Sequence, residues 1–250
     1  MIIYEDEQID DLQINGLKII QKKNGFKFGT DAVLLSDFAK DIHADGIMDL
    51  CTGTGVVALL LSAKTNAEII YGIEIQESIA KTAQRSVELN GLEERVFIKC
   101  GDLRTCVADY GKRSFELITC NPPYMRAGAG LLNESDSKLV SRHEVTCTLE
   151  DVIKTASELV AVSGHLVMVH RPSRLCDVLY LMRKYEIEPK RIRFVHKNAS
   201  EPPVLFLADG LYKGKSDVKI LPPLIMYDEN GEETEELKRI YDRRNGENDR

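Results

Sequence analysis

A regular alternation of strand-like and helix-like segments between residues 46 and 185 constrains the fold of this chain more than any other feature. Short apolar runs predict strands at 46–50, 68–74, 96–100, 115–120 and 164–170. The segments between them predict helices at 55–64, 76–90, 148–162 and 173–185. Strands that alternate with helices form right-handed βαβ units, which places the strands in a mostly parallel sheet. The sequence therefore predicts an α/β fold.

Both ends of this alternating region carry a hairpin signal. Residues 189–196 and 203–211 are strand-like with no helix between them, which predicts a C-terminal antiparallel hairpin and a seven-stranded sheet. Near the N-terminus, Asn15-Gly16 supplies two positive-φ positions between the strand-like runs 12–14 and 17–20. We therefore expect an N-terminal hairpin extension as well.

Single residues mark the ends of several expected helices. Thr30 or Asp31 is placed to cap a helix that runs to about Lys40. Gly91 is placed to end the helix at 76–90, and Thr148 with Asp151 to cap the helix at 148–162. The expected organisation is an extension at 1–45 packed on the core, a principal domain at 46–225 and a charged tail at 226–250.

Composition narrows the class of protein. The chain has 43% hydrophobic and 29% charged residues, as in ordinary globular proteins. No apolar run approaches the roughly 18–20 residues of a membrane helix. The first residues lack the basic segment of a secretory signal, so we expect a cytoplasmic protein. The six cysteines lack Cys-x-x-Cys spacing, so we expect no metal site. Cys51, Cys100 and Cys120 end strand-like runs and are predicted to be buried, reduced thiols.

The net charge of −7 argues at first against a nucleic-acid partner. Two basic clusters nevertheless offer local binding surfaces for phosphates. They comprise Lys18, Lys22, Lys23 and Lys27, and then Lys184, Lys190, Arg191, Arg193 and Lys197.

A glycine-rich loop, Asp49-Leu-Cys-Thr-Gly53-Thr-Gly55, follows the first strand of the alternating region. Glycines there let the backbone approach a ligand, and the next helix offers free N–H groups. Glu74 ends the following strand and could accept the two hydroxyls of a ribose. Both NAD and S-adenosyl-L-methionine (SAM) fit this outline. Asp49 favours SAM, because a carboxylate would repel a pyrophosphate but attract an ammonium and a sulfonium group.

The motif Asn121-Pro122-Pro123-Tyr124 follows the fourth strand, at the edge of the sheet where ligands bind. The Asn121 side-chain oxygen and the Pro122 carbonyl could accept the two N–H bonds of an amide or an aminopurine and hold its lone pair out of the plane. Proline makes the direction of that carbonyl rigid, and Tyr124 offers a ring for stacking. The motif predicts methylation of an amide-like or exocyclic nitrogen.

These motifs resemble those of class I SAM-dependent N-methyltransferases with an N-P-P-Y motif, whose Rossmann-like sheet ends in an antiparallel hairpin. The resemblance covers about residues 10–225 and is strongest to bacterial tRNA (adenine-N6) methyltransferases that act beside the anticodon of a valine tRNA. Besides the two motifs above, Phe28-Gly-Thr30-Asp31-Ala and Arg142-His143-Glu144 carry it, although Gly29 stands where that family has Ser. The resemblance implies that Thr30 and Asp31 close the SAM pocket and that Arg142, His143 and Glu144 bind the substrate.

The candidate residues form three groups. The catalytic candidates are Asn121, Pro122, Pro123 and Tyr124. The cofactor-binding candidates are Thr30, Asp31, Asp49, Cys51, Gly53, Gly55, Glu74, Ile75, Asp102, Leu103 and Asn121, with Asp102 expected to bind the adenine amino group. The substrate-binding candidates are Tyr124, Arg142, His143 and Glu144.

Several acceptors remain open. The leading hypothesis is adenine N6 of tRNA. A glutamine amide in a release factor is the first alternative, but such enzymes usually carry a separate N-terminal helical domain, and only about 45 residues precede the first cofactor strand here. Guanine N2 of ribosomal RNA and a DNA base are further enzyme alternatives. A SAM-fold binding module without catalysis is the non-enzyme alternative, and the motif residues argue against it.

Overall fold

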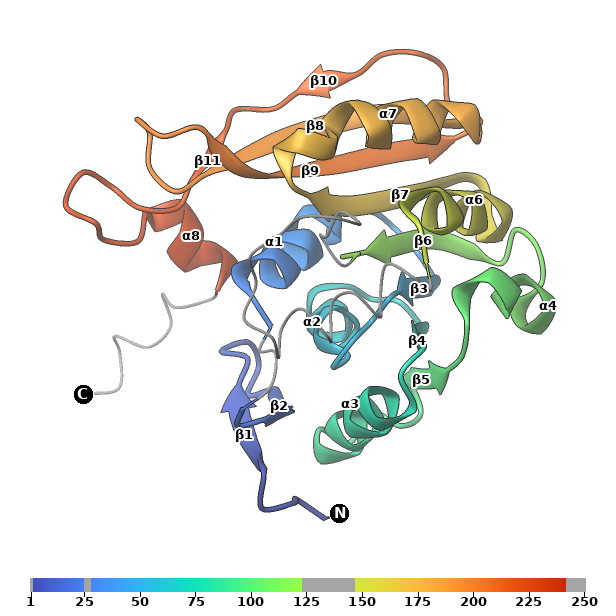
Figure 1. Cartoon of the computed structure of the whole chain (residues 1–250), viewed down its shortest axis with the longest axis vertical. Coiled ribbons are helices and arrows are strands. Elements are labelled where there is room, and N and C mark those ends of the chain that lie inside the picture. Colours follow the sequence, from blue (N-terminus) through green and yellow to red (C-terminus); the bar gives the residue numbers. More distant parts are fainter. Residues whose placement is uncertain (1, 25–27, 123–146, 242–250) are drawn as a thin grey trace.

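The computed structural model describes residues 2–24, 28–122 and 147–241, which fold into a sheet with helices on both faces (Figure 1). Within these residues the main sheet has nine strands in the order β10-β8-β9-β7-β6-β3-β4-β5, with β11 also paired to β8. The strands are β3 (Gly46–Leu50), β4 (Ile69–Glu74), β5 (Val96–Cys100), β6 (Phe115–Cys120), β7 (Val160–His170), β8 (Ile187–His196), β9 (Pro203–Tyr212), β10 (Lys219–Ile220) and β11 (Leu224–Ile225).

The direction of the strands confirms the predicted architecture. Strands β3 to β7 pair in parallel, whereas β9 runs antiparallel to both β7 and β8. These seven strands form the predicted mostly parallel sheet with its antiparallel hairpin. The two-residue strands β10 and β11 extend it beyond β8 and were not predicted, because two residues are too few for a periodic pattern.

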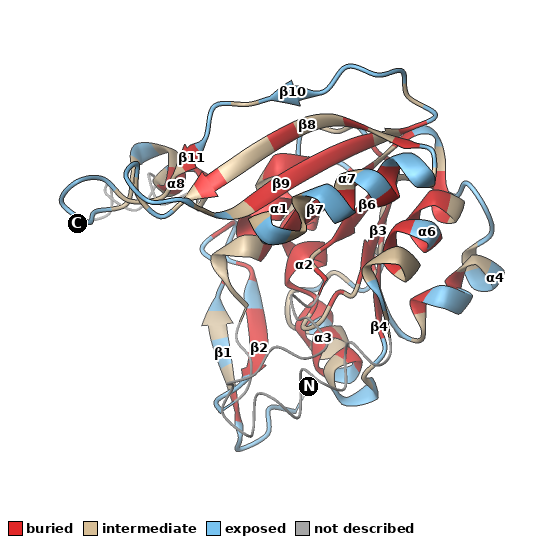
Figure 2. Cartoon of the chain, turned by 45° about the horizontal axis from the view of Figure 1, so that its top comes forward, coloured by how far each residue is buried: buried red, intermediate tan, exposed pale blue. Residues whose placement is uncertain are grey.

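Helices cover the two faces of the sheet in separate layers (Figure 2). One layer contains α1 (Thr30–Ala39), α2 (Val56–Lys64) and α3 (Glu77–Leu89), and the other contains α4 (Cys106–Tyr110), α6 (Leu149–Leu159) and α7 (Leu175–Lys184). Side chains alternate between the layers along each strand, as the pleat requires. In β3, for example, Ile47 packs under the first layer, and Met48 and Leu50 pack under the second.

Local signals explain most helix boundaries. Thr148 and Asp151 form the predicted capping box of α6, and Gly91 has the predicted left-handed conformation after α3. Two boundaries were predicted wrongly. Gly29, rather than Thr30 or Asp31, is the N-cap of α1. Helix α6 ends at Leu159 instead of residue 162, because the Val-Ala-Val segment that follows pairs in strand β7.

The N-terminal hairpin is present but displaced from its predicted strands. Strand β1 (Glu7–Asp11) pairs antiparallel with β2 (Lys18–Lys22), and residues 12–14 lie in the connection. Asn15 and Gly16 have the expected positive φ angles of 49° and 69°. The connection is longer than a two-residue turn because the side chains of Leu12 and Ile14 are buried in the core.

A salt bridge holds this hairpin against α3. Glu7 is buried, and its two carboxylate oxygens accept hydrogen bonds from Arg85 at 2.6 and 2.7 Å. These bonds lower the pKa of Glu7 to about 2.

At the other end of the chain, α8 (Glu235–Ile240) buries Leu237 and Ile240 in the same core cluster as α1 and α2. No helix in the described ranges is long and apolar enough to cross a membrane.

Candidate active site

The order in which strands are added to the sheet reverses between β3 and β6. An open α/β sheet binds its ligands at such a point. From β3 the chain proceeds outward through β4 to β5, and it then returns to place β6 on the other side of β3. Both the glycine loop after β3 and the Asn121 motif after β6 therefore begin at this point. Cα pairing of Leu50 with Cys120 sets them side by side.

The glycine loop turns sharply over the end of β4. Cys51, Gly53 and Gly55 all have positive φ angles, at 57°, 55° and 81°. Such angles are unfavourable for a residue with a Cβ, so Cys51 is held there by its surroundings. A Cβ on Gly72 of β4 would lie 2.8 Å from the Thr52 hydroxyl. The loop thus packs directly on the neighbouring strand, and the N–H groups of Thr52, Gly53 and Gly55 are hydrogen-bonded within the protein.

Asp49 is buried beneath this loop with both of its oxygens hydrogen-bonded. The Thr52 hydroxyl donates to one oxygen at 2.6 Å and the Thr119 hydroxyl to the other at 2.7 Å. Burial raises the pKa of Asp49 to about 7, and the nearby Glu74 charge adds to that shift, while the two hydroxyls oppose it. A carboxyl group that titrates near neutrality can gain a negative charge when a cation binds beside it.

Glu74 links the glycine loop to the start of α3. Its carboxylate accepts the Gly53 N–H at 3.1 Å and the Gln76 N–H at 2.9 Å. The side chain is buried, but the next residue, Ile75, is 39% exposed. An acidic group that ends a strand, followed by an exposed apolar side chain, suits a ribose and an attached planar base.

The other cofactor candidates surround this position less directly. Asp102 binds the side chain of Arg104 at 2.5–3.0 Å, and Leu103 is buried. An adenine amino group would therefore compete with Arg104 for Asp102. Thr30 and Asp31 begin α1, and because α1 ends next to the start of β3, they lie toward the carboxyl edge of the sheet.

Asn121 and Pro122 are the described part of the Asn-Pro-Pro-Tyr motif. Asn121 is half-buried and Pro122 is buried at the end of β6. In β6, Leu117 packs under the α1–α2 layer. Because side chains alternate, Thr119 and then Asn121 point to that same face. Pro123, Tyr124, Arg142, His143 and Glu144 lie outside the described residues.

Three thiols meet at this edge. The thiols of Cys120 and Cys147 lie beside that of Cys51. The neighbouring Cys120 thiol and burial raise the pKa of Cys51 well above its usual value, and the pKa values of Cys120 and Cys147 are raised as well. Such thiols stay protonated and unreactive. Cys100, in contrast, is exposed, so its predicted burial is wrong.

Several residues of the predicted basic clusters pair with carboxylates of the protein itself. Lys22 pairs with Asp6 and Glu7. In the second cluster, carboxylates pair with Lys184 (Glu150), Arg191 (Asp209) and Arg193 (Glu236), and Lys190 donates to the Lys215 carbonyl. These side chains mainly stabilise the fold. Lys27 lies outside the described residues.

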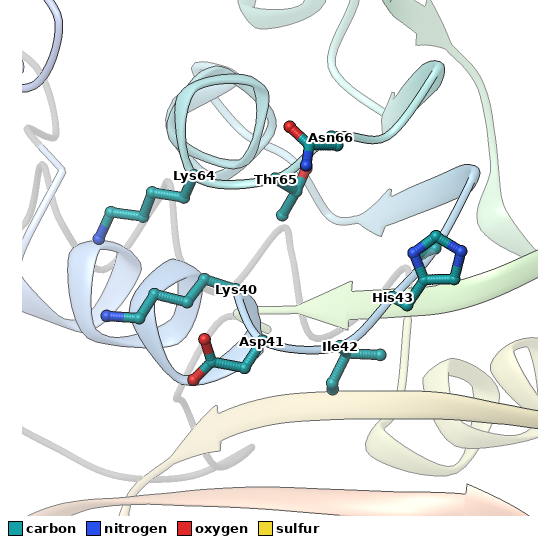
Figure 3. A pocket seen from close by; sticks show the side chains of 8 residues that line it. Lys40, Asp41, Ile42, His43, Lys64, Thr65 and Asn66 are labelled. Carbon is teal, nitrogen blue, oxygen red and sulfur yellow. The ribbon is translucent and has the colours of Figure 1, made fainter.

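A hollow of about 210 Å³ lies elsewhere, between the C-terminal ends of α1 and α2 (Figure 3). Its lining includes Lys40, His43, Lys64 and Asn66. These residues precede β3 or β4, so the hollow opens at the amino edge of the sheet, opposite the glycine loop.

In the described part of the chain, no cluster of three or more His, Cys, Asp or Glu side chains could hold a metal ion.

Comparison with known proteins identifies the family. The family model of the methyltransferase small domain matches residues 20–185. The chain belongs to this methyltransferase family. The tRNA1(Val) (adenine(37)-N6)-methyltransferase of Porphyromonas gingivalis is 30% identical over 190 residues, covering 73% of each chain. The enzyme of the same name from Christiangramia forsetii is 28% identical, covering 74% of this chain and 77% of its own.

Solved structures of low sequence identity share the fold of this methyltransferase. A protein from Agrobacterium tumefaciens, described as a predicted O-methyltransferase, has a TM-score of 0.69 at 23% identity and covers 85% of this chain and 95% of its own. The M. jannaschii protein TYW2, crystallised with AdoMet (SAM), has a TM-score of 0.56 at 12% identity, covering 84% and 87%. These likenesses show the class I methyltransferase fold.

The sequence missed several residues that support the methyltransferase site. Thr52 and Thr119 hold Asp49, and Gly72 admits the glycine loop. Thr119 carried a usable signal, because it is a hydroxyl residue within an otherwise apolar stretch, Leu-Ile-Thr-Cys. Its partner could not be read from the sequence, because the pairing depends on β6 lying beside β3.

Proposed function

We propose that this methyltransferase transfers a methyl group from SAM to N6 of an adenine in tRNA, next to the anticodon. The observation that carries this proposal is the position of Asn121 at the end of β6, beside the glycine loop after β3. The names of the Porphyromonas and Christiangramia relatives support adenine N6 as the acceptor. A tRNA acceptor also implies that the enzyme works in the cytoplasm.

The residues of the chain fit SAM by their chemistry. Glu74 accepts hydrogen bonds at the tip of β4 and suits the ribose hydroxyls, and Ile75 offers an apolar surface to the adenine ring. The backbone N–H groups in the first turn of α2, after Gly55, suit the carboxylate of the cofactor. Asp49 places a titratable carboxyl near the positively charged end. When bound, SAM supplies an electrophilic methyl group on its sulfonium.

Asn121 and Pro122 orient the acceptor nitrogen. The adenine amino group donates one N–H to the Asn121 side-chain oxygen and the other to the Pro122 carbonyl. These two bonds turn the nitrogen lone pair out of the ring plane and toward the methyl group. The nitrogen loses its proton after it has been methylated, because the charged product is acidic, so no base is needed beforehand. Catalysis then comes from positioning and electrostatics.

Replacement of Asn121 tests this role. We expect Asn121→Ala to bind SAM with near-normal affinity but to lose most methyl transfer, about a hundredfold or more, because one of two orienting bonds is gone. Asn66→Ala, an exposed asparagine at the amino edge (Figure 3), is the matched control and should leave transfer unchanged. Wild-type turnover by Asn121→Ala would refute the orienting role.

The acceptor is tested with labelled SAM. Unmodified tRNA, a release factor and ribosomal RNA are each offered to the purified chain, and tRNA alone should be labelled. Mass spectrometry of tRNA from cells with and without the gene should then show one lost N6-methyladenosine. Labelling of the release factor instead would replace the proposed acceptor by a glutamine amide.

A further inference from the structure

Strand β7 adjoins β6 and ends at His170, next to the candidate active site. Cys120 pairs with Met168, so Asn121 and Pro122 follow alongside Val169 and His170. The segment Arg171-Pro172-Ser173-Arg174 comes immediately afterwards. Adjacent strands are about 4.8 Å apart. The rim of the site on this side is therefore formed by a segment that carries two arginines.

Arg171 faces the same side of the sheet as Asn121. Val167 and Val169 pack under the α1–α2 layer, and the backbone of Arg171 is still extended, with φ −73° and ψ 143°. Alternation thus places Arg171 in the same row of side chains as these two valines. Its side chain is exposed.

Arg174 is oriented by Asp177. Its Nε atom lies 2.6 Å from an Asp177 oxygen, and the Arg174 side chain is 24% exposed. An arginine has five N–H donors in a fixed plane, so a guanidinium held through Nε still has donors to offer a phosphate. Pro172 begins the short 3₁₀ turn Pro172–Arg174 and makes the connection between the two arginines rigid.

The charges of both arginines act on one buried ring, that of His170. His170 is 2% exposed and its Nδ1 accepts the Arg171 N–H at 2.8 Å. Burial, followed by the charges of Arg174 and Arg171, lowers the pKa of His170 to about 4. The imidazole is therefore neutral at physiological pH, and the positive charge at this rim comes from the two arginines.

We propose that Arg171 and Arg174 form a phosphate-binding rim that holds the RNA backbone next to the nucleotide being methylated. This inference rests on the proposed function. An adenine that enters the site base first leaves its flanking phosphates at the rim. Arg174 pairs with a carboxylate, as several residues of the basic clusters do, but these two arginines lie one strand away from Asn121.

The experiment compares two double variants with the same change in charge. The test protein is Arg171→Gln with Arg174→Gln. The control is Arg183→Gln with Lys213→Gln, which removes two cations at the opposite edge, where they pair with Glu188 and Glu186. SAM affinity is measured by calorimetry, and methylation of an unmodified tRNA transcript is measured between 50 and 200 mM salt.

We expect the test variant to bind SAM normally, to raise KM for tRNA by about tenfold or more, and to reduce the slope of log KM against log salt by about 1.5, since two phosphate contacts are lost. The control should keep the wild-type KM and slope. Replacing both arginines by lysine retains the charge and should restore most of the slope; this variant also decides the matter if the glutamine variant loses SAM binding.

Failures of the two proposals are distinguishable. If wild-type protein methylates tRNA and the glutamine variant keeps both KM and salt slope, the rim is overturned and the proposed function stands. If the control variant loses as much as the test variant, the effect is one of net charge and the rim is again overturned. If wild-type protein binds SAM but labels only a release factor, both proposals are overturned.

Discussion

We predict that Asp49 releases a proton when SAM binds. The carboxyl is buried, its pKa is raised to about 7, and it lies beneath the loop proposed to hold the positively charged end of SAM. A positive charge about 6 Å away would stabilise the ionised form by about 2–3 kcal/mol at an effective dielectric constant of about 20, which lowers this pKa by about two units.

These values fix the expected dependence on pH. With a pKa of about 7 in the free protein and about 5 in the complex, SAM affinity should rise about 20-fold between pH 5.5 and 7.5, and about 0.8 proton should be released at pH 6. Calorimetry in buffers of different ionisation enthalpy measures both quantities. Asp49→Asn should bind SAM weakly, with no pH dependence in this range and no proton release.

The same shift predicts an opposite effect on the stability of the protein without SAM. Because the folded-state pKa of Asp49 lies above its unfolded value of about 3.8, the native protein holds the extra proton between these pH values. The carboxyl therefore becomes destabilising as pH rises toward 7, and Asp49→Asn should unfold at a higher temperature than wild type at pH 8. A pH-independent SAM affinity in the wild type would refute the reasoning, as would a variant that still releases a proton.

Two further substitutions test neighbouring parts of the structure. Glu74→Gln leaves one amide oxygen where two carboxylate oxygens accept the Gly53 and Gln76 N–H groups, and it loses the carboxylate proposed to bind the ribose, so calorimetry should show SAM affinity reduced by about 10- to 100-fold together with a lower melting temperature. The pKa of Glu7 is lowered to about 2 by Arg85, so its contribution, about 2 kcal/mol, is present above pH 4.5 and is lost as pH falls toward 2. Glu7→Gln should thus lower the unfolding free energy at pH 7 but not at pH 2; an equal loss at both would contradict the ion pair.

The sequence predicted elements whose signals are local. The alternation of strands and helices, Gly91 after α3 and the capping box at Thr148 all depend on residues within a few positions of each other. The displaced N-terminal hairpin shows where local signals fail. Asn15 and Gly16 have the expected positive φ angles. Leu12 and Ile14, however, lie outside the strands, because their side chains are buried in the core.

The two basic clusters show a second limit of sequence reasoning. The sequence shows that Arg191 and Arg193 are charged, but it does not show that Asp209 and Glu236 pair with them. Those ion pairs form only in the folded protein. Conversely, nothing in the sequence distinguishes Arg171 and Arg174 from the other lysines and arginines, of which the chain has 33 in total. They lie near Asn121 because β7 pairs with β6, and the order of the strands along the chain does not reveal that pairing.

The side-chain alternation of three neighbouring strands places the proposed site residues on one face of the sheet. Asp49 in β3, Glu74 in β4 and Asn121 just after β6 face the α1–α2–α3 layer, on the same side as Ile47, Ile70 and Leu117. The Thr119 hydroxyl bonds Asp49 and thereby ties the strand before Asn121 to the strand before the glycine loop. A displacement of the acceptor nitrogen relative to the methyl donor would therefore require β6 to slide along β3 and break this buried bond together with the strand pairing.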